Sequence, residues 1–536
     1  MAPSAAPRCR SASGRGEFTA PRGAEPDKTK YDSENLGDLK SQVQNFADQF
    51  TPEKQAYCAI GIQAPIVNVL TGETSSVGNG DAGRMTDTAS ILSTMARDSC
   101  DNYQSLVTGI VVINSAPLGE LSGAEDDTPG TGGGSSDAGG SRAQTKTNLG
   151  FDFDEEGTPV NREIVIVAAS QGVVDKGGYR HFMEKEIHEQ PDAIAHTLAA
   201  MTGPDGKLST PLAREDLAAI DGIVMLAAGT SHYAAMVARY WIESLARVPV
   251  SCEIASEYRY RKPVTGAFSC AVAISQSGES LDTLMAMRHA GEAGLRTIGL
   301  VNVPGSTIAR EADMVMPTRA GPEIGVASTK AFTAQLTALI SFAVALAEAK
   351  GQISVERRDE IHAAIQGLPS MVGRTLGLFD DIRPLAHSLT AARSALYLGR
   401  DVLFPVALEG ALKLKELSYI HAEGFASGEM KHGPIALIEE GLPVVALLAA
   451  DEVMGKAASN LQEAAARGGR IILITEERAA STVDFAESVI TVPNVDPLLA
   501  PVLLTVPVQI LAYLTAFEKG TDVDQPRNLA KSVTVE

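Results

Sequence analysis

The chain has 536 residues, of which 44% are hydrophobic and 21% are charged, a composition typical of a soluble globular protein with room for several domains. Its net charge of −21 argues against a nucleic-acid-binding protein, which would need a basic face. Five cysteines in so long a chain give no disulfide framework and no paired metal-ligand spacing, so we expect a reducing cytoplasm, no bound metal and no cofactor.

The first 150 residues give the weakest structural signal. Residues 1–23 are rich in Arg and Ser and nearly free of acids, so we expect them to be disordered. Transit peptides share this composition, but no apolar segment follows that would make a secretory signal. Residues 24–120 form a divergent region of unknown fold. Residues 121–150 contain a Gly/Ser-rich run and are expected to be a flexible linker.

Short patterns before residue 210 suggest local structure. Residues 35–50 favour a helix, and the apolar runs within 57–70 and 106–113 favour strands. Residues 151–209 are predicted to form a connecting hairpin and helix. Glu156-Gly157 would occupy the hairpin turn, and a charged helix would follow.

From residue 210 onward, buried strands alternate with helices, which predicts doubly wound parallel sheets in an α/β fold. Residues 210–355 and 380–520 both show this alternation, so we predict an internal duplication. Residues 497–517 are apolar, but Pro501 and Pro507 interrupt them, which favours a buried core helix over a membrane span. The expected strands are 222–228, 271–275, 297–301, 314–317, 395–398, 444–448 and 471–475, with a long core helix over 331–349.

Six polar residues follow two of the predicted strands, at the points where helices are expected to begin. Ligands bind at this edge of an open α/β sheet, and helix N-termini offer free N–H groups to an anion. Hydroxyl groups add donors without adding charge, so a sugar phosphate can be held despite the acidic composition. Helix capping is the alternative role for any single Ser or Thr. The candidates are Thr230, Ser231, Ser275, Gln276, Ser277 and Ser280.

Residues 407–418 are mostly strong helix formers. Helical spacing places Glu409, Lys413 and Glu416 on one stripe, and a Gly-containing loop is expected to lead from there to His432. A Glu, a Lys and a His together supply what proton transfer beside a carbonyl needs. A solvated stripe of ion pairs is the alternative.

This segment, ALEGALKLKELSYIHAEGFASGEMKHGP, resembles the signature of the isomerase half of the glutamine–fructose-6-phosphate aminotransferase family. The tail DQPRNLAKSVTVE is similar to the C-terminal tail of the same family. The resemblance runs over residues 175–536. It implies two tandem flavodoxin-like SIS domains, followed by a catalytic tail over 521–536 that could close over the site as a lid.

Three shorter segments carry the same resemblance. SQSGES is similar to the family's phosphate-binding loop, with Ser280 where Thr is common, and GTS resembles its CGTS turn, with Ala228 in place of Cys. VASTK resembles a further stretch that lines the substrate. There the family uses the backbone of Val326 and the hydroxyl of Ser328.

The resemblance also implies the chemical roles of four residues. Lys531 would form a Schiff base with the open-chain keto sugar, and His432 would open the sugar ring. Glu416 would carry a proton between C1 and C2, with Lys413 assisting at the sugar hydroxyls. The family brings the His loop across a dimer interface, so a homodimer is implied.

The implied reaction makes glucosamine 6-phosphate from fructose 6-phosphate, with glutamine or ammonia as the nitrogen donor. The family's glutaminase half begins with a catalytic Cys, whereas this sequence begins Met1-Ala2-Pro3, and Cys58 fits a buried structural residue. The sequence therefore argues against glutamine hydrolysis by this chain. The alternatives are a stand-alone hexose-phosphate isomerase, an amino-sugar-phosphate deaminase, and a non-catalytic protein that binds sugar phosphates.

Overall fold

The structure, a computed structural model, describes residues 152–153, 159–160, 175–203, 206, 208 and 210–534. The chain divides into two units, residues 1–167 and residues 168–536. In the first unit, β1 (Asp152–Phe153) pairs antiparallel with β2 (Pro159–Val160), within the region predicted to form a hairpin. The expectations for residues 1–150, including the helix, the two strands and the linker, lie outside the described residues.

The second unit contains two five-stranded sheets, and all of their strand pairs are parallel. Their orders are β4-β3-β5-β6-β7 and β12-β11-β10-β8-β9. Numbered within each sheet, both give the flavodoxin-like order 2-1-3-4-5. This common order confirms the predicted α/β class. The strands are β3 (Ile223–Ala227), β4 (Val250–Ile254), β5 (Cys270–Ser275), β6 (Arg296–Val301), β7 (Met314–Pro317), β8 (Ser394–Gly399), β9 (His421–Ala426), β10 (Pro443–Leu448), β11 (Arg470–Glu476) and β12 (Ser488–Val492).

The prediction of a loop between His421 and His432 was wrong, because residues 421–426 form the edge strand β9. A β-carbon on Gly424 would lie 2.8 Å from the α-carbon of Leu408, so glycine lets β9 pass close to the helix that follows β8. Glycine in a strand weakens the apolar pattern from which strands are predicted. The strands β4 and β12, which were also missed, are edge strands with partly exposed residues.

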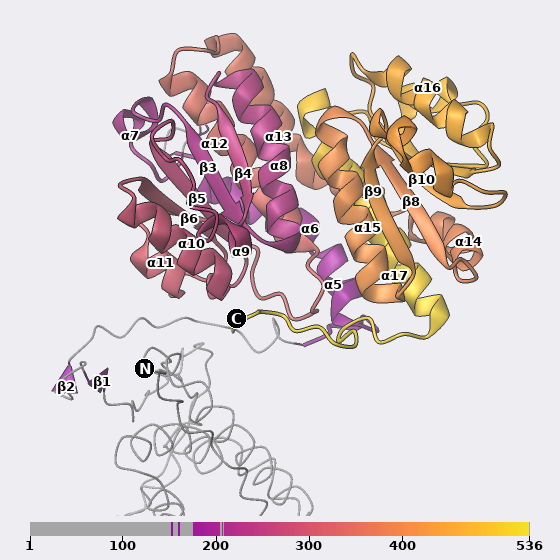
Figure 1. Cartoon of the computed structure of the whole chain (residues 1–536), viewed down its shortest axis with the longest axis horizontal. Coiled ribbons are helices and arrows are strands. Elements are labelled where there is room, and N and C mark those ends of the chain that lie inside the picture. The colour runs from indigo at the N-terminus through magenta and orange to yellow at the C-terminus, as the bar shows by residue number, and fades with distance from the viewer. Residues whose placement is uncertain are drawn as a thin grey trace, which may run out of the picture. The chain divides into compact units, whose positions relative to one another are not determined.

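Helices cover both faces of each sheet (Figure 1). The connector before the first sheet forms α5 (Phe182–His188) and α6 (Gln190–Ala200). The other α-helices are α7 (Arg214–Ala218), α8 (Gly229–Leu245), α9 (Ala255–Tyr258), α10 (Leu281–Glu292), α11 (Thr307–Glu311), α12 (Lys330–Ala349), α13 (Val355–Leu376), α14 (Phe379–Leu389), α15 (Phe404–Ser418), α16 (Met454–Ala465) and α17 (Ala500–Lys519). Short 3-10 helices are η3 (Asp401–Leu403), η4 (Glu429–His432), η5 (Pro434–Leu437), η6 (Glu477–Thr482) and η7 (Pro497–Leu499).

The two sheets share one apolar core. Alternate residues of a strand face opposite sides, so Met225 and Tyr397 point into this core while Val224 packs on the outer helices. The long helices α12 and α17 lie within the shared core. Both are long and apolar enough to span a membrane, yet 94% of the most apolar window of each is buried in the fold. The prediction of a buried core helix over residues 497–517 is therefore confirmed.

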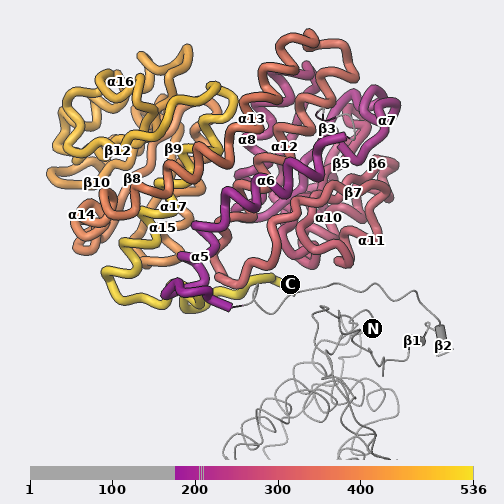
Figure 2. The backbone as a smooth tube through the Cα atoms, turned by 180° about the vertical axis from the view of Figure 1, so that it is seen from behind, coloured from indigo at the N-terminus to yellow at the C-terminus, as the bar shows by residue number. Residues whose placement is uncertain are grey.

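The residues after α17 return across the second unit as an extended tail. Figures 1 and 2 both show it running beside α5 and ending near the first sheet. We call the part of the second unit built on each sheet a domain, the first on β3 to β7 and the second on β8 to β12. Backbone hydrogen bonds join the tail to the first domain: the N–H of Val326 donates to the carbonyl of Asp524 (3.0 Å), and the N–H of Leu281 donates to that of Val533 (3.2 Å). The tail therefore reaches the edge of the sheet where the hydroxyl-rich loops lie.

Candidate active site

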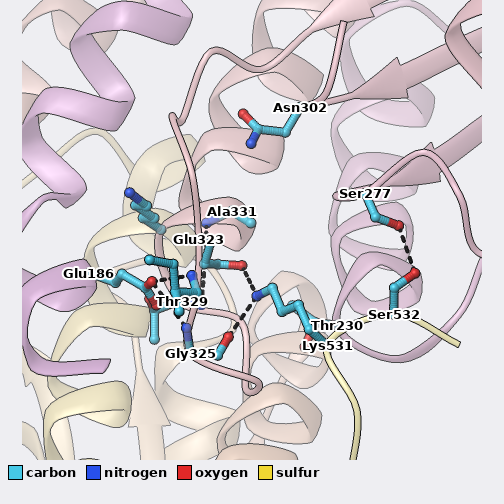
Figure 3. A network of polar contacts seen from close by, with 12 residues as sticks. Glu186, Thr230, Ser277, Asn302, Glu323, Gly325, Thr329, Ala331, Lys531 and Ser532 are labelled. Carbon is cyan, nitrogen blue, oxygen red and sulfur yellow. Dashed lines mark hydrogen bonds and ion pairs between the residues drawn. The ribbon is translucent and has the colours of Figure 1, made fainter. Parts of the chain in front are cut away.

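Hydrogen bonds of its own serine hydroxyls hold the conformation of the loop between β5 and α10. The hydroxyl of Ser275 accepts a hydrogen bond from the N–H of Gly278 (3.0 Å) and lies 3.2 Å from that of Ser280. Gly278 has a φ of +66°, and a β-carbon there would lie 2.0 Å from the Oγ of Ser306. The hydroxyl of Ser277 accepts a hydrogen bond from the N–H of Glu279. It also faces the tail, where it lies 3.1 Å from the hydroxyl of Ser532 (Figure 3).

Helix capping does not account for these hydroxyls. Within the described part of the chain, no side chain caps the N-terminus of α8 or α10, although Ser280 occupies the capping position of α10. The hydroxyl of Ser280 contacts Ser275 instead. Gln276 and Ser277 are half-buried beside it. The loop thus places several hydroxyls beside a helix N-terminus that has no side-chain cap, although the N–H of Leu281 is taken by the tail. Hydroxyls at a helix N-terminus are suited to an anion.

The other hydroxyl-rich turn, at the start of α8, touches the second domain. The hydroxyl of Thr230 lies 3.3 Å from Oε1 of Glu409 and accepts from Nζ of Lys413 at 3.1 Å. Ser231 accepts from Nε2 of Gln335 on α12 (2.9 Å). The turn therefore joins the first domain directly to the helix α15.

The predicted stripe on α15 is a buried charge cluster, so the alternative of a solvated stripe is wrong. Nζ of Lys413 lies 2.6 Å from Oε2 of Glu416 and 3.5 Å from Oε1 of Glu409. The side chains of Lys413 and Glu409 are 1% and 0% exposed, whereas that of Glu416 is 21% exposed. Glu416 is thus the member of the cluster that a ligand can reach.

Burial and the neighbouring charges shift the pKa values of Glu409 and Lys413 in this cluster. It raises the pKa of Glu409 to about 8, against the pull of the Lys413 charge. Burial alone would lower the pKa of Lys413, but Glu409 and Glu416 raise it above its ordinary value. Burial thus favours the protonated form of Glu409, while the neighbouring acids favour the charged form of Lys413.

The tail places Lys531 beside the buried acid Glu323 of the first domain. Its Nζ donates to Oε2 of Glu323 at 2.5 Å and to the carbonyl of Gly325 at 2.8 Å (Figure 3). Oε1 of Glu323 accepts from the N–H groups of Thr329 and Ala331 at 2.9 and 3.0 Å. Burial alone would raise the pKa of Glu323, but the Lys531 charge and these hydrogen bonds hold it below its ordinary value.

A second buried acid, Glu186, holds the backbone turn next to Lys531. Oε1 of Glu186, on α5, accepts from the N–H groups of Ile324 and Gly325. Burial, and then the nearby Glu323 carboxylate, raise the pKa of Glu186 to about 8. Glu186 therefore fixes the backbone turn whose carbonyl holds Lys531.

The structure does not bring His432 to the other candidates. It lies in η4, is exposed, and its side chain makes no hydrogen bond or ion pair with another described residue. Its neighbour Lys431 pairs with Glu463 on α16, 2.7 Å away. Val326 is occupied by its backbone bond to the tail, and Ser328 is half-buried close to it.

Five residues with a role in this arrangement were missed from the sequence: Glu186, Glu323, Gln335, Asp524 and Ser532. Glu323 precedes the VASTK segment, and Asp524 and Ser532 lie in the tail whose resemblance was noted, so their positions carried a signal. Cavities of about 610 and 330 Å³ are lined by residues of α10–β6 and of α5–α17, and among those residues there is no candidate.

Known proteins resemble this chain over both of its five-stranded sheets. The SIS domain family matches residues 216–345 and 388–519. Glutamine–fructose-6-phosphate aminotransferase (isomerizing) of Zymomonas mobilis is 51% identical over 385 residues, which are 72% of this chain and 63% of that protein. The Brucella abortus protein of the same name is 50% identical, over 64% of its length. The chain thus spans a little under two thirds of the curated relatives that it matches.

A solved structure matches the same region. The C-terminal domain of glucosamine–fructose-6-phosphate aminotransferase from Francisella tularensis is 44% identical to this chain, with a TM-score of 0.64. The match covers 66% of this chain and all of that domain. The duplication predicted from the sequence is confirmed by the two SIS matches and the two sheets of equal strand order.

Proposed function

The chain belongs to the glutamine–fructose-6-phosphate aminotransferase family through its two SIS domains, and we propose that it converts fructose 6-phosphate into glucosamine 6-phosphate. One observation carries the proposal: within one unit, the Lys531 tail is hydrogen-bonded to the loop at Ser277, and the charged helix α15 is hydrogen-bonded to the turn at Thr230. Glutamine or ammonia is the nitrogen donor, and we favour ammonia, either free or supplied by a partner.

The phosphate would bind at the N-terminus of α10. The helix dipole and the hydroxyls of Ser277 and Ser280 favour an anion there, and Gln276 adds an amide. Thr230 and Ser231 would hold sugar hydroxyls, with Val326 and Ser328 on the facing segment. This choice of neutral donors agrees with the acidic net charge of the chain.

Proton transfer would take place at Glu416. In the open-chain sugar, Glu416 would take a proton from C1 and return it to C2 through an enediol or enamine-like intermediate. Lys413 supports this role because its ammonium lies 2.6 Å from that carboxylate, although its own side chain is only 1% exposed. Before that transfer, the amine of Lys531 would leave Glu323 and attack the C2 carbonyl, with loss of water, to form a Schiff base. Ammonia would then add to C2 and displace the lysine amine, so that the imine nitrogen becomes the amino group of the product.

Ring opening is assigned to His432. Because His432 is exposed and without a side-chain partner among the described residues, it would reach the sugar of a second copy of the chain. A homodimer is therefore part of the proposal, as is a cytoplasmic location, where sugar phosphates and reduced cysteines occur together.

The test is a product assay with fructose 6-phosphate and either ammonium or glutamine. We expect glucosamine 6-phosphate from ammonium and none from glutamine alone. Formation of glucose 6-phosphate alone would point to an isomerase instead, and release of ammonia from glucosamine 6-phosphate without synthesis would point to a deaminase. Binding of fructose 6-phosphate without turnover would show a non-catalytic sugar-phosphate-binding protein.

A further inference from the structure

The tail is fastened to the connector helix α5 by a single carboxylate. Oδ2 of Asp524 accepts from the N–H of Phe182 at 3.0 Å, and Oδ1 accepts from the N–H of Met183 at 2.9 Å. Lys176 lies 3.3 Å from the same carboxylate. The side chain of Asp524 is only 15% exposed, so these bonds are largely shielded from water. Both oxygens are used, one for each N–H group.

The same residue also reaches the loop that holds Lys531. The carbonyl of Asp524 accepts from the N–H of Val326. The connector grips this loop independently, since Glu186 accepts from the N–H of Gly325 at 3.1 Å. Gly325 in turn accepts from Lys531 through its carbonyl. Tail, connector and loop are therefore tied to one another in pairs. We call Asp524, Glu186 and residues 324–326 the clasp.

The tail packs differently on the two sides of Pro526. Val523, beside Asp524, is buried in the apolar core, whereas Leu529 and Val533 are 44% and 56% exposed. Arg527 contacts Tyr419, whose hydroxyl accepts from its N–H at 2.9 Å, and Ser532 contacts Ser277. Because the contacts beyond Pro526 are mainly polar, losing the Asp524 anchor should shift this part of the tail without unfolding the domains.

We propose that Asp524 is a positioning residue: by pinning the start of the tail to α5, it sets where the amine of Lys531, seven residues further along, enters the site. This inference rests on the proposed function, in which Lys531 is the reacting amine. A tail anchored at one point searches a small volume, and its amine meets the sugar in a fixed direction. Asp524 itself lies outside the reacting groups.

The first arm of the test uses the full chain without sugar and compares Asp524→Asn with Asp522→Asn. An Asn at 524 can accept only one of the two N–H groups, whereas Asp522 uses a single oxygen, Oδ1, for the N–H groups of Asp524 and Gln525, and an Asn can keep that bond. We expect amide hydrogen exchange at Val326 and Leu281 to become about tenfold faster or more in Asp524→Asn. In Asp522→Asn it should stay near wild type. Equal exchange in all three proteins would overturn the proposal.

The second arm measures synthesis of glucosamine 6-phosphate from ammonium. We expect kcat of Asp524→Asn to fall by about 10- to 100-fold, while KM for fructose 6-phosphate changes little because the phosphate loop is untouched. Asp524→Glu keeps both oxygens and should recover part of the loss. An unchanged kcat, or a rise in KM with kcat intact, would contradict the positioning role.

The two arms separate the two proposals. An inactive wild type that still shows the expected exchange pattern would refute the proposed function and leave the clasp intact. An active wild type with normal exchange in Asp524→Asn would refute the clasp alone. If Asp524→Asn does not fold, Lys176→Met, which removes the exposed partner of the same carboxylate, replaces it in the exchange arm, with faster exchange supporting the clasp and unchanged exchange opposing it.

Discussion

Nζ of Lys531 lies 2.5 Å from Oε2 of Glu323, although 208 residues separate them in the chain. This ion pair fixes the tail amine at a buried acid of the first domain, where it can be released to a bound sugar. It also makes stability depend on pH, because Glu323 has a lowered pKa in the folded chain.

Glu323→Gln should therefore lower stability at neutral pH. A carboxylate whose folded pKa is depressed contributes stability above its unfolded pKa, and this contribution is lost as the pH falls through the folded value. Because Lys531 is partly exposed and can turn to water, we expect a loss of about 1–2 kcal/mol at pH 7, shrinking in acid. Urea unfolding at several pH values measures it. Glu360→Gln, at an exposed acid, serves as the control. If the difference in the free energy of unfolding between wild type and Glu323→Gln grew in acid, the lowered pKa of Glu323 would be contradicted.

Glu409→Gln should show the opposite pH dependence. Burial raises the pKa of Glu409 from 4.5 to about 8, so the folded chain keeps a proton that the unfolded chain releases between these values. Wild-type stability from this group is therefore fully present below pH 4.5 and falls as the pH rises to about 8. Gln mimics the protonated acid at every pH. We expect the stability of the variant relative to wild type to rise from pH 5 to pH 8.

Urea unfolding of Glu409→Gln beside Glu423→Gln checks this expectation, because Glu423 is a partly exposed acid on β9. A relative stability that stays flat or falls with pH would show that Glu409 is charged in the folded chain. Lys413 would then pair with two carboxylates.

Gly278→Ala should damage the phosphate loop. Its φ of +66° disfavours a side chain, and the new β-carbon would meet the Oγ of Ser306 at 2.0 Å. We expect the free energy of unfolding to fall by about 2 kcal/mol or more and the binding of fructose 6-phosphate to weaken. Urea unfolding measures the first effect and calorimetry measures the second. Gly266→Ala is the matched control, since no atom lies within 4 Å of its β-carbon. Normal sugar-phosphate binding by Gly278→Ala would place the phosphate elsewhere.

Glu416→Gln should block proton transfer while leaving the fold intact, because Glu416 is the exposed end of its cluster. We expect deuterium exchange between solvent and fructose 6-phosphate to slow by about 10²- to 10⁴-fold, with binding nearly unchanged. Nuclear magnetic resonance of the sugar follows the exchange. Wild-type exchange in this variant would assign the proton transfer to another group.

The parts of the fold predicted from the sequence are those with strong local patterns. The central strands β3, β5, β8 and β10 are continuous apolar runs, whereas the missed strands β4, β9 and β12 lie at sheet edges and carry polar or glycine residues. Edge strands bury less surface, so their sequences are less constrained.

The candidate site shows the same division. Lys413 and Glu416 are three residues apart on one helix, so helical periodicity alone brings them together. The contacts of Lys531 with Glu323 and of Asp524 with Phe182 span 208 and 342 residues. No spacing rule reaches over such separations, so these partners emerge only when the tail is seen folded against the connector and the loop.

The most direct test of the whole account is to trap the tail amine on the sugar. The chain is incubated with fructose 6-phosphate and sodium borohydride, which reduces a Schiff base to a stable secondary amine, and the modified peptide is identified by mass spectrometry. The account requires the adduct on Lys531, its loss in Lys531→Arg, and its persistence in Glu416→Gln, which still binds the sugar. A chain that binds fructose 6-phosphate but carries no adduct, or carries it on another lysine, would contradict the account.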